Sequence, residues 1–363
     1  MAIRKVTILE FLELSLLHPV LDVRSPGEYN HAHIPCAISL PLFNDEERKV
    51  VGTTYKQTSR EAAIKIGLDY FGPKMRMMVE KVEEIILKSQ TLSTENLQLT
   101  TKKTVLVHCW RGGMRSGAVA WLLDMYGFDV VLLVGGYKSF RNWVLKQFEI
   151  DYNFQLIGGY TGSGKTIVLQ ELKKQNQTVL DLEEIAQHKG SAFGGLDNKQ
   201  QPSTEMFENL LSIELYILTQ KNRQQLIWTE DESQRIGQVN LHPVLWQQLR
   251  NKPLLFIDIP FEERLNYLVK EYGEYDKGQL IKAIERIQKR LGGLETKTAI
   301  NALQENDTKY CFEVLLKYYD KHYLKGLHNR SNFKEIVQKI ELTNVAASNA
   351  EHLLTITNNH KNA

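Results

Sequence analysis

The feature that most constrains the fold is a series of short apolar runs, each ended by turn-forming residues and separated by helical patterns. The runs are VLDV (20–23), TVLVHC (104–109), DVVLLVGG (129–136), FQLIGG (154–159) and LLFIDI (254–259). Such runs are typical of parallel strands buried on both faces, and their alternation with patterns such as 117–127 and 166–175 indicates α/β layers. The sequence therefore predicts a doubly wound parallel sheet.

The length of 363 residues is enough for two domains with real cores. A strand with a glycine-rich turn begins near residue 150, so we predict one domain over 1–148, with a helical insert at about 44–100. A second α/β domain is predicted over 149–275, followed by a helical region over 276–363.

Composition excludes several classes of protein. Hydrophobic residues make up 42% and charged residues 24%, which is typical of an ordinary globular chain. The 45 basic and 43 acidic residues give a net charge of +2, so any nucleic-acid site must be a local patch. The three cysteines are widely spaced and no apolar stretch reaches 18 residues, so we expect a cytoplasmic protein without membrane contact.

The segment HCWRGGMRS (108–116) predicts a reactive cysteine. Cys109 ends a predicted strand and precedes a helix, so backbone N–H groups should face its sulfur. Arg111 and Arg115 should lower the thiol pKa and stabilise an anion, and the loop residues Gly112, Gly113 and Ser116 would wrap around it. A lone cysteine on a strand is more often a packing residue. Two arginines and two glycines beside it favour the catalytic interpretation.

The segment GYTGSGKT (159–166) satisfies G-x-x-x-x-G-K-[ST] between a predicted strand and a predicted helix, which is the context of a phosphate-binding P-loop. The predicted diphosphate-binding residues are Gly159, Gly162, Gly164, Lys165 and Thr166. Thr166 is a candidate ligand for Mg²⁺, with Glu230 or Asp231 as the partner acid. Those two acids could equally be a solvated strand end, and no metal site is certain from the sequence.

The segment DVRSPGEYNHAHIPCAISLP (22–41) resembles the signature of rhodanese-like domains, with Ala32 and Cys36 at positions that are usually glycine. The spacing His-Cys-x5-Arg-Ser, which ends at Arg115, resembles that of rhodanese-related phosphatases. A loop of this length is wide enough for a tetrahedral anion, so we expect the substrate of Cys109 to carry a phosphoryl group.

A longer series of strings resembles the tRNA 2-selenouridine synthase family across nearly the whole chain. The strings are LPLFNDEER (40–48), YKQ (55–57), HCWRGGMRS (108–116), GGYKSFR (135–141), GYTGSGKT (159–166), DLE (181–183), HKGSAFG (188–194), QPS (201–203), EDESQRIG (230–237) and PFEER (260–264). The resemblance implies an enzyme that replaces the sulfur of a wobble-position 2-thiouridine in the tRNA anticodon with selenium from selenophosphate, through an S-geranylated intermediate made from geranyl diphosphate.

The resemblance also implies which ligands are involved. Selenophosphate would occupy the Cys109 loop and geranyl diphosphate the P-loop, without a need for ATP. Mg²⁺ is a candidate cofactor, and an enzyme that supplies selenophosphate is a candidate partner. Whether selenium is carried covalently on Cys109 stays open.

Two basic segments are candidates for the tRNA surface. Lys282, Arg286, Lys289 and Arg290 share one face of a predicted helix, although such faces are often merely solvated. The insert carries more charge, with Arg48, Lys49, Lys56, Arg60, Lys65, Lys74 and Arg76.

If the cysteine motif is considered without the longer series of strings, two alternative functions remain open. One is a Cys-dependent phosphatase or arsenate reductase fused to an NTPase. The other is a regulatory rhodanese-like or sulfurtransferase domain attached to a P-loop kinase of a small molecule.

Overall fold

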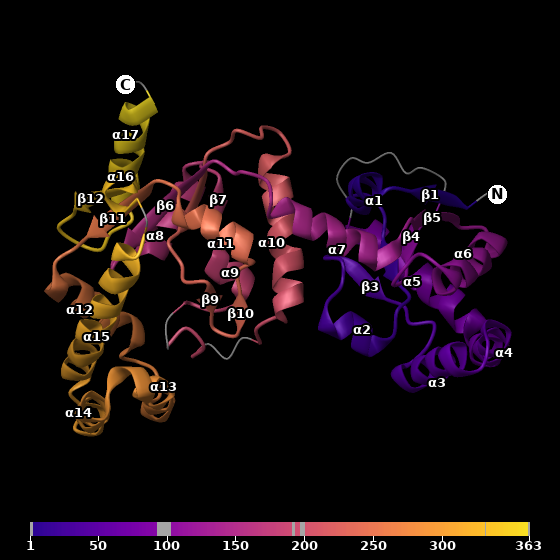
Figure 1. Ribbon diagram of the computed structural model, residues 1–363, viewed down its shortest axis with the longest axis horizontal. Helices are drawn as coiled ribbons and strands as arrows, with labels where there is room; N and C mark the ends of the chain where they lie inside the picture. Colours follow the sequence, from indigo (N-terminus) through magenta and orange to yellow (C-terminus); the bar gives the residue numbers. More distant parts are fainter. Residues whose placement is uncertain (1–2, 93–102, 191–192, 197–199, 331, 362–363) are drawn as a thin grey trace. The chain divides into compact units, whose positions relative to one another are not determined.

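The computed structural model describes residues 3–92, 103–190, 193–196, 200–330 and 332–361. The chain divides into two compact units, Met1–Lys146 and Gln147–Ala363 (Figure 1).

The first unit is built on a five-stranded sheet in the order β1-β5-β4-β2-β3. Its strands, in chain order, are β1 (Arg4–Val6), β2 (Val20–Asp22), β3 (Ala37–Ser39), β4 (Thr104–His108) and β5 (Asp129–Leu133). Every pairing is parallel. Because the carboxyl ends of parallel strands meet at one edge, the loops after β2 and β4 are brought together there.

Helices connect these strands. They are α1 (Ile8–Ser15), α2 (Pro26–His31), α3 (Asp45–Gln57), α4 (Arg60–Phe71), the short 3₁₀ helix η1 (Gly72–Lys74), α5 (Met75–Leu92), α6 (Met114–Tyr126) and α7 (Gly136–Gln147). Ser25 and Glu28 form a capping box that starts α2, and Asn44 and Glu47 do the same for α3. The predicted insert thus contains α3, α4 and α5 within its described part.

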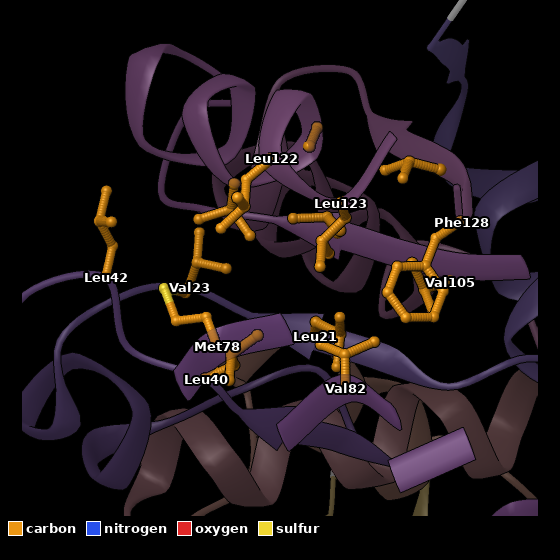
Figure 2. Close-up of a cluster of buried hydrophobic side chains, with 14 of the residues drawn as sticks. Leu21, Val23, Leu40, Leu42, Met78, Val82, Val105, Leu122, Leu123 and Phe128 are labelled. Atoms are coloured by element: carbon orange, nitrogen blue, oxygen red, sulfur yellow. The ribbon is translucent and has the colours of Figure 1, made fainter. Parts of the chain in front are cut away.

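The core of the first unit lies between the sheet and the helices that cover it (Figure 2). Leu21 and Val105 come from the strands, and Leu122 and Met78 come from α6 and α5; none is more than 4% exposed. This packing fixes the end of β4, from which the cysteine loop extends.

The second unit contains a five-stranded parallel sheet in the order β12-β11-β6-β8-β7. Its strands are β6 (Phe154–Gly159), β7 (Val179–Leu180), β8 (Ile227–Glu230), β11 (Leu254–Asp258) and β12 (Val337–Glu341). A separate hairpin joins β9 (Arg235–Ile236) and β10 (Val239–Asn240). The central strand β6 leads directly into the P-loop.

The helices of this unit are α8 (Lys165–Lys174), α9 (Leu182–Ala186), α10 (Thr204–Thr219), α11 (Pro243–Arg250), α12 (Phe261–Tyr272), α13 (Lys277–Leu291), α14 (Gly293–Gln304), α15 (Thr308–His328), α16 (Phe333–Ile336) and α17 (Asn349–Lys361). The fold class expected from the sequence is confirmed.

The region 276–363, which the sequence analysis predicted to be helical, also contains a strand. Residues Val337–Glu341 form β12, which pairs along all of β11 and completes the sheet. Helix α17 follows, and its Ala350 and Leu353 are buried in the core that also holds Leu169 of α8. Few apolar residues mark these two elements in the sequence, so their place depends on contacts with distant segments.

Among the described residues, no helix is both long enough and apolar enough to cross a membrane.

Candidate functional site

Cys109 lies between β4 and α6, where the sequence analysis placed it. Its side chain is only 3% exposed, and its Sγ lies 3.2 Å from Ser116 Oγ. Ser116 Oγ also lies 3.1 Å from the carbonyl oxygen of Gly113, so its one O–H can be donated to that carbonyl or, when Cys109 is a thiolate, to the sulfur.

The surroundings of Cys109 favour its thiolate form. Burial alone would raise the thiol pKa, but it is outweighed by hydrogen bonds from the Ser116 side chain and backbone, the charge of Arg115 and the Arg111 backbone N–H. The pKa therefore lies below its usual value. A partly stabilised thiolate is the form of cysteine that acts as a nucleophile.

The shape of the loop depends on two glycines that pack against each other. A Cβ at Gly136 would lie 2.3 Å from the Cys109 carbonyl oxygen and 2.5 Å from the Gly112 nitrogen. Gly112 has a φ of 66°, which favours glycine, and a Cβ there would lie 2.7 Å from the Leu133 carbonyl oxygen. Gly113, by contrast, has open space around it. The close approach lets the first turn of α7 bind the loop, with Tyr137 N–H donating to the Cys109 carbonyl at 2.8 Å.

Arg115 and Arg111 have different settings. Arg115 is held by Glu28 of α2, with Nη1 donating to Oε2 at 2.7 Å, whereas Arg111 is exposed. Burial opposes ionisation of Glu28, yet its hydrogen bond and ion pair with Arg115 lower its pKa to about 2. The sequence analysis did not single out Glu28, although it belongs to the quoted rhodanese-like signature.

The insert reaches the cysteine loop through two arginines. Arg48 of α3 lies 3.4 Å from Glu28, the partner of Arg115. Arg60 of α4 approaches the sulfur of Met114, the first residue of α6, at 4.0 Å. Lys74 pairs with Glu47 and Arg76 with Glu80, so these two charges of the insert are already neutralised.

The P-loop connects β6 to α8. Gly164 has a φ of 74° and is the residue before the helix, while Lys165 Nζ donates to the Gly159 carbonyl at 3.2 Å. Thr166 Oγ1 donates to Glu230 Oε1 at 2.9 Å. Gly162 lies against α12, where a Cβ would come within 3.0 Å of Leu268.

The two candidate partner acids have different contacts. Glu230 is buried beside Thr166, whereas Asp231 accepts a hydrogen bond from Tyr323 at 3.0 Å and is paired with Arg330. The Tyr323 hydroxyl in turn accepts the Gly159 N–H at 3.1 Å. Asp231 therefore contacts the P-loop only through Tyr323, whereas Glu230 contacts Thr166 directly.

Two further carboxylates, which the sequence analysis did not single out, join Glu230. Oxygens of Glu183, Glu230 and Glu232 lie within 4.8 Å of one another. Burial raises the pKa of all three, and repulsion between the carboxylates adds to the shift for Glu183 and Glu232. A carboxylate cluster beside a threonine hydroxyl supplies the oxygen ligands that Mg²⁺ prefers, so these residues fit that cation.

Several strings from the sequence analysis meet at the ring of His188. A Cβ at Gly194 would lie 2.8 Å from the ring, and one at Gly237 would lie 2.7 Å from it. Gln201 donates to the carbonyls of Ala186 and Ile236, which ties the strings together. QPS, EDESQRIG and the described residues of HKGSAFG thus form one local structure beside the carboxylates, while Ser191 and Ala192 lie outside the described residues.

PFEER also contributes to the P-loop. Arg264 donates to the carbonyl of Thr161 at 3.2 Å and pairs with Asp320 of α15 through two hydrogen bonds. Its guanidinium lies 4.7 Å from the centre of the Tyr160 ring. The P-loop is therefore supported from α12 and α15.

The four basic residues of α13 that the sequence analysis named are all exposed, whereas Leu280, Ala283 and Ile284 of the same helix are buried in the core. They are Lys282, Arg286, Lys289 and Arg290. Arg286 is close to the His188 loop, since a side chain at Gly195 would meet its Nη1 at 3.9 Å.

The other two cysteines differ from Cys109. Burial raises the thiol pKa of Cys36, and it raises that of Cys311 to about 12. Cys311 lies within the helical core around α15. Neither has the electrostatic setting of a nucleophile.

Comparisons with known proteins agree with this architecture. Residues 9–142 match the family model of the rhodanese-like domain, and residues 152–354 match a model described as the tRNA 2-selenouridine synthase AAA domain. A tRNA 2-selenouridine synthase from Sulfurovum sp. (strain NBC37-1) is 33% identical over 358 residues, covering 89% of this chain and 93% of that protein.

Two other relatives carry the same name. That of Bdellovibrio bacteriovorus is 31% identical, with 86% of this chain and 89% of the relative covered. That of Nitrosomonas europaea is 37% identical, with 70% and 63% covered.

The fold and the two sites define a protein in which a rhodanese-like domain with a cysteine loop precedes a P-loop domain. The chain belongs to the tRNA 2-selenouridine synthase family.

Proposed function

We propose that this protein modifies tRNA, replacing the sulfur of a wobble-position 2-thiouridine with selenium through an S-geranyl intermediate. One observation carries the proposal: the chain has two candidate anion sites of different chemistry, a cysteine loop in the first unit and a P-loop in the second. A thiolate loop suits selenophosphate, and a P-loop suits the diphosphate of geranyl diphosphate.

In the first reaction the thiocarbonyl sulfur would attack the geranyl carbon that bears the diphosphate. The C–S bond forms, the C–O bond breaks, the diphosphate leaves with the electron pair, and the base loses its N3 proton. Lys165 and the backbone of the P-loop would hold the diphosphate. Mg²⁺ bound by Thr166 and Glu230 would supply further positive charge there.

In the second reaction a selenium nucleophile would add to the C2 carbon of the base, and geranyl thiol would leave with a proton. Alkylation improves the sulfur as a leaving group because it departs as a neutral thiol. Water would then take the phosphoryl group and release phosphate as the P–Se bond breaks, while Arg115 and Arg111 stabilise the phosphoryl charge. Cys109 would position the bound selenophosphate, so that its selenium adds to the base without a change of oxidation state.

The test is mass analysis of nucleosides after the protein is incubated with 2-thiouridine tRNA. Geranyl diphosphate alone should yield S-geranyl-2-thiouridine, and added selenophosphate should yield 2-selenouridine. Unchanged 2-thiouridine in both reactions would contradict the proposal. Phosphate release from an aryl phosphate without tRNA would instead favour the phosphatase alternative.

A further inference from the structure

A cavity of about 410 Å³ adjoins the P-loop. It begins at Thr166, the residue after the P-loop lysine, and extends along α8 over Leu169, Gln170 and Lys173. The opposite wall comes from α9 and the loop after it, including Gln187, His188 and Gly194.

We propose that this cavity binds the nucleoside that accepts the isoprenoid, that is, the wobble 2-thiouridine turned out of the anticodon loop. This proposal rests on the function proposed above, and it assigns a role to the HKGSAFG segment.

The chemistry of the walls favours a nucleoside over an isoprenoid chain. Leu169 and Val179 line the cavity but are almost fully buried, so the groups that a ligand can reach are mainly those of the other residues. Gln170, Lys173 and Gln187 offer hydrogen-bonding groups, and Asp181, Glu183 and Glu184 add carboxylates. The edge of a base and a ribose form hydrogen bonds with such groups. An isoprenoid chain would desolvate the polar and charged groups without giving any hydrogen bond in return.

The position of the cavity fits an acceptor. Thr166 and Glu183 line it, and Thr166 directly follows the P-loop lysine that would hold the diphosphate. A base bound there would therefore lie near the reacting isoprenoid carbon, as substitution at that carbon requires.

The outer wall connects the cavity to the basic face of α13. Gly194 lines the cavity, and its neighbour Gly195 lies close to Arg286. Exposed arginines and lysines bind RNA through phosphates and position the strand, whereas a pocket reads the base. An anticodon loop bound on α13 would therefore lie beside the entrance.

The test compares binding of two anticodon stem-loop RNAs, one with 2-thiouridine and one with uridine at the wobble position, without geranyl diphosphate. Gln170→Trp would place an indole in the cavity and should remove the preference for the thiolated RNA. Lys173→Ala should weaken binding of that RNA about fivefold, as expected for one lost hydrogen bond. Both positions lie on the surface of α8, so the fold should persist.

Lys174→Ala is the matched control, because Lys174 is a neighbouring exposed lysine outside the cavity. It should bind both RNAs like the parent protein. If Gln170→Trp and Lys173→Ala leave RNA binding unchanged, or weaken only the binding of geranyl diphosphate, the cavity does not hold the nucleoside.

This readout is separate from the proposed reaction because it needs no turnover. If the parent protein prefers the thiolated RNA but forms no S-geranyl product, the proposed function fails while the cavity assignment is still decided by the variants.

Discussion

Arg115 Nη1 donates a hydrogen bond to Glu28 Oε2 at 2.7 Å, joining the cysteine loop to a helix 87 residues earlier in the chain. The same carboxylate accepts the Ser25 N–H at the start of α2. Glu28 thus orients the guanidinium that lies beside Cys109, and it acts as a positioning residue for the anion loop.

Replacing this carboxylate should affect selenation more than geranylation. Glu28→Gln keeps the shape but loses the charge, so we expect selenation to fall by about tenfold or more, as for other positioning groups. Steady-state formation of 2-selenouridine from pre-geranylated tRNA measures this. Glu46→Gln, at an exposed acid of α3, is the control. Equal rates for the two variants would contradict the role of Glu28.

The three cysteines should differ in their reactivity with pH. The pKa of Cys109 is lowered, so its thiolate persists to lower pH than that of an ordinary cysteine, whereas the pKa of Cys36 and that of Cys311 are raised. The rate of alkylation by iodoacetamide, followed by peptide mass analysis over a range of pH, should therefore begin to rise at lower pH for the buried Cys109 than for the exposed Cys36. Ser116→Ala removes a hydrogen bond to the thiolate and should shift the Cys109 profile to higher pH. An unshifted profile would contradict that role.

Lys165→Ala should weaken use of geranyl diphosphate and leave pre-geranylated tRNA convertible. The lysine acts by its charge on a diphosphate, so the loss belongs to the step that uses the isoprenoid. Lys174→Ala is the control here as well. Similar losses with both tRNA substrates would mean that the P-loop serves folding or tRNA binding instead.

Replacing Lys282, Arg286, Lys289 and Arg290 by Gln should weaken binding similarly for all tRNAs. The slope of log K against log[salt] should become shallower by roughly 0.7 to 0.9 for each lost phosphate contact. These side chains are exposed, so their loss should change stability by only about 0.5 kcal/mol. An unchanged slope in the folded variant would place the tRNA surface elsewhere, with the exposed Lys49, Lys56, Arg60 and Lys65 of the insert as the next candidates.

Local patterns predicted β2, β4, β5, β6 and β11, the turn after β4 and the P-loop, because each is encoded within a few neighbouring residues. The other five strands of the two sheets were not among the predicted runs. The run FQLIGG and the motif after it place Lys165 and Thr166 without any knowledge of distant segments. Glu183 and Glu232 were not singled out, because an acid cluster forms only when β7 and β8 lie side by side.

Contacts between distant segments also explain why the sequence analysis missed the role of Glu28 and the strand β12. The pairing of Glu28 with Arg115 and the addition of β12 to β11 both join segments more than 75 residues apart. No local pattern encodes such contacts. They follow from the topology of the parallel sheets.

The most direct test of the account uses the variant Cys109→Ala with 2-thiouridine tRNA, geranyl diphosphate and selenophosphate, followed by mass analysis of the nucleosides. The account predicts that S-geranyl-2-thiouridine accumulates and that 2-selenouridine is lost, because the thiolate loop belongs to the selenium step alone. Formation of 2-selenouridine at the rate of the parent protein would contradict it.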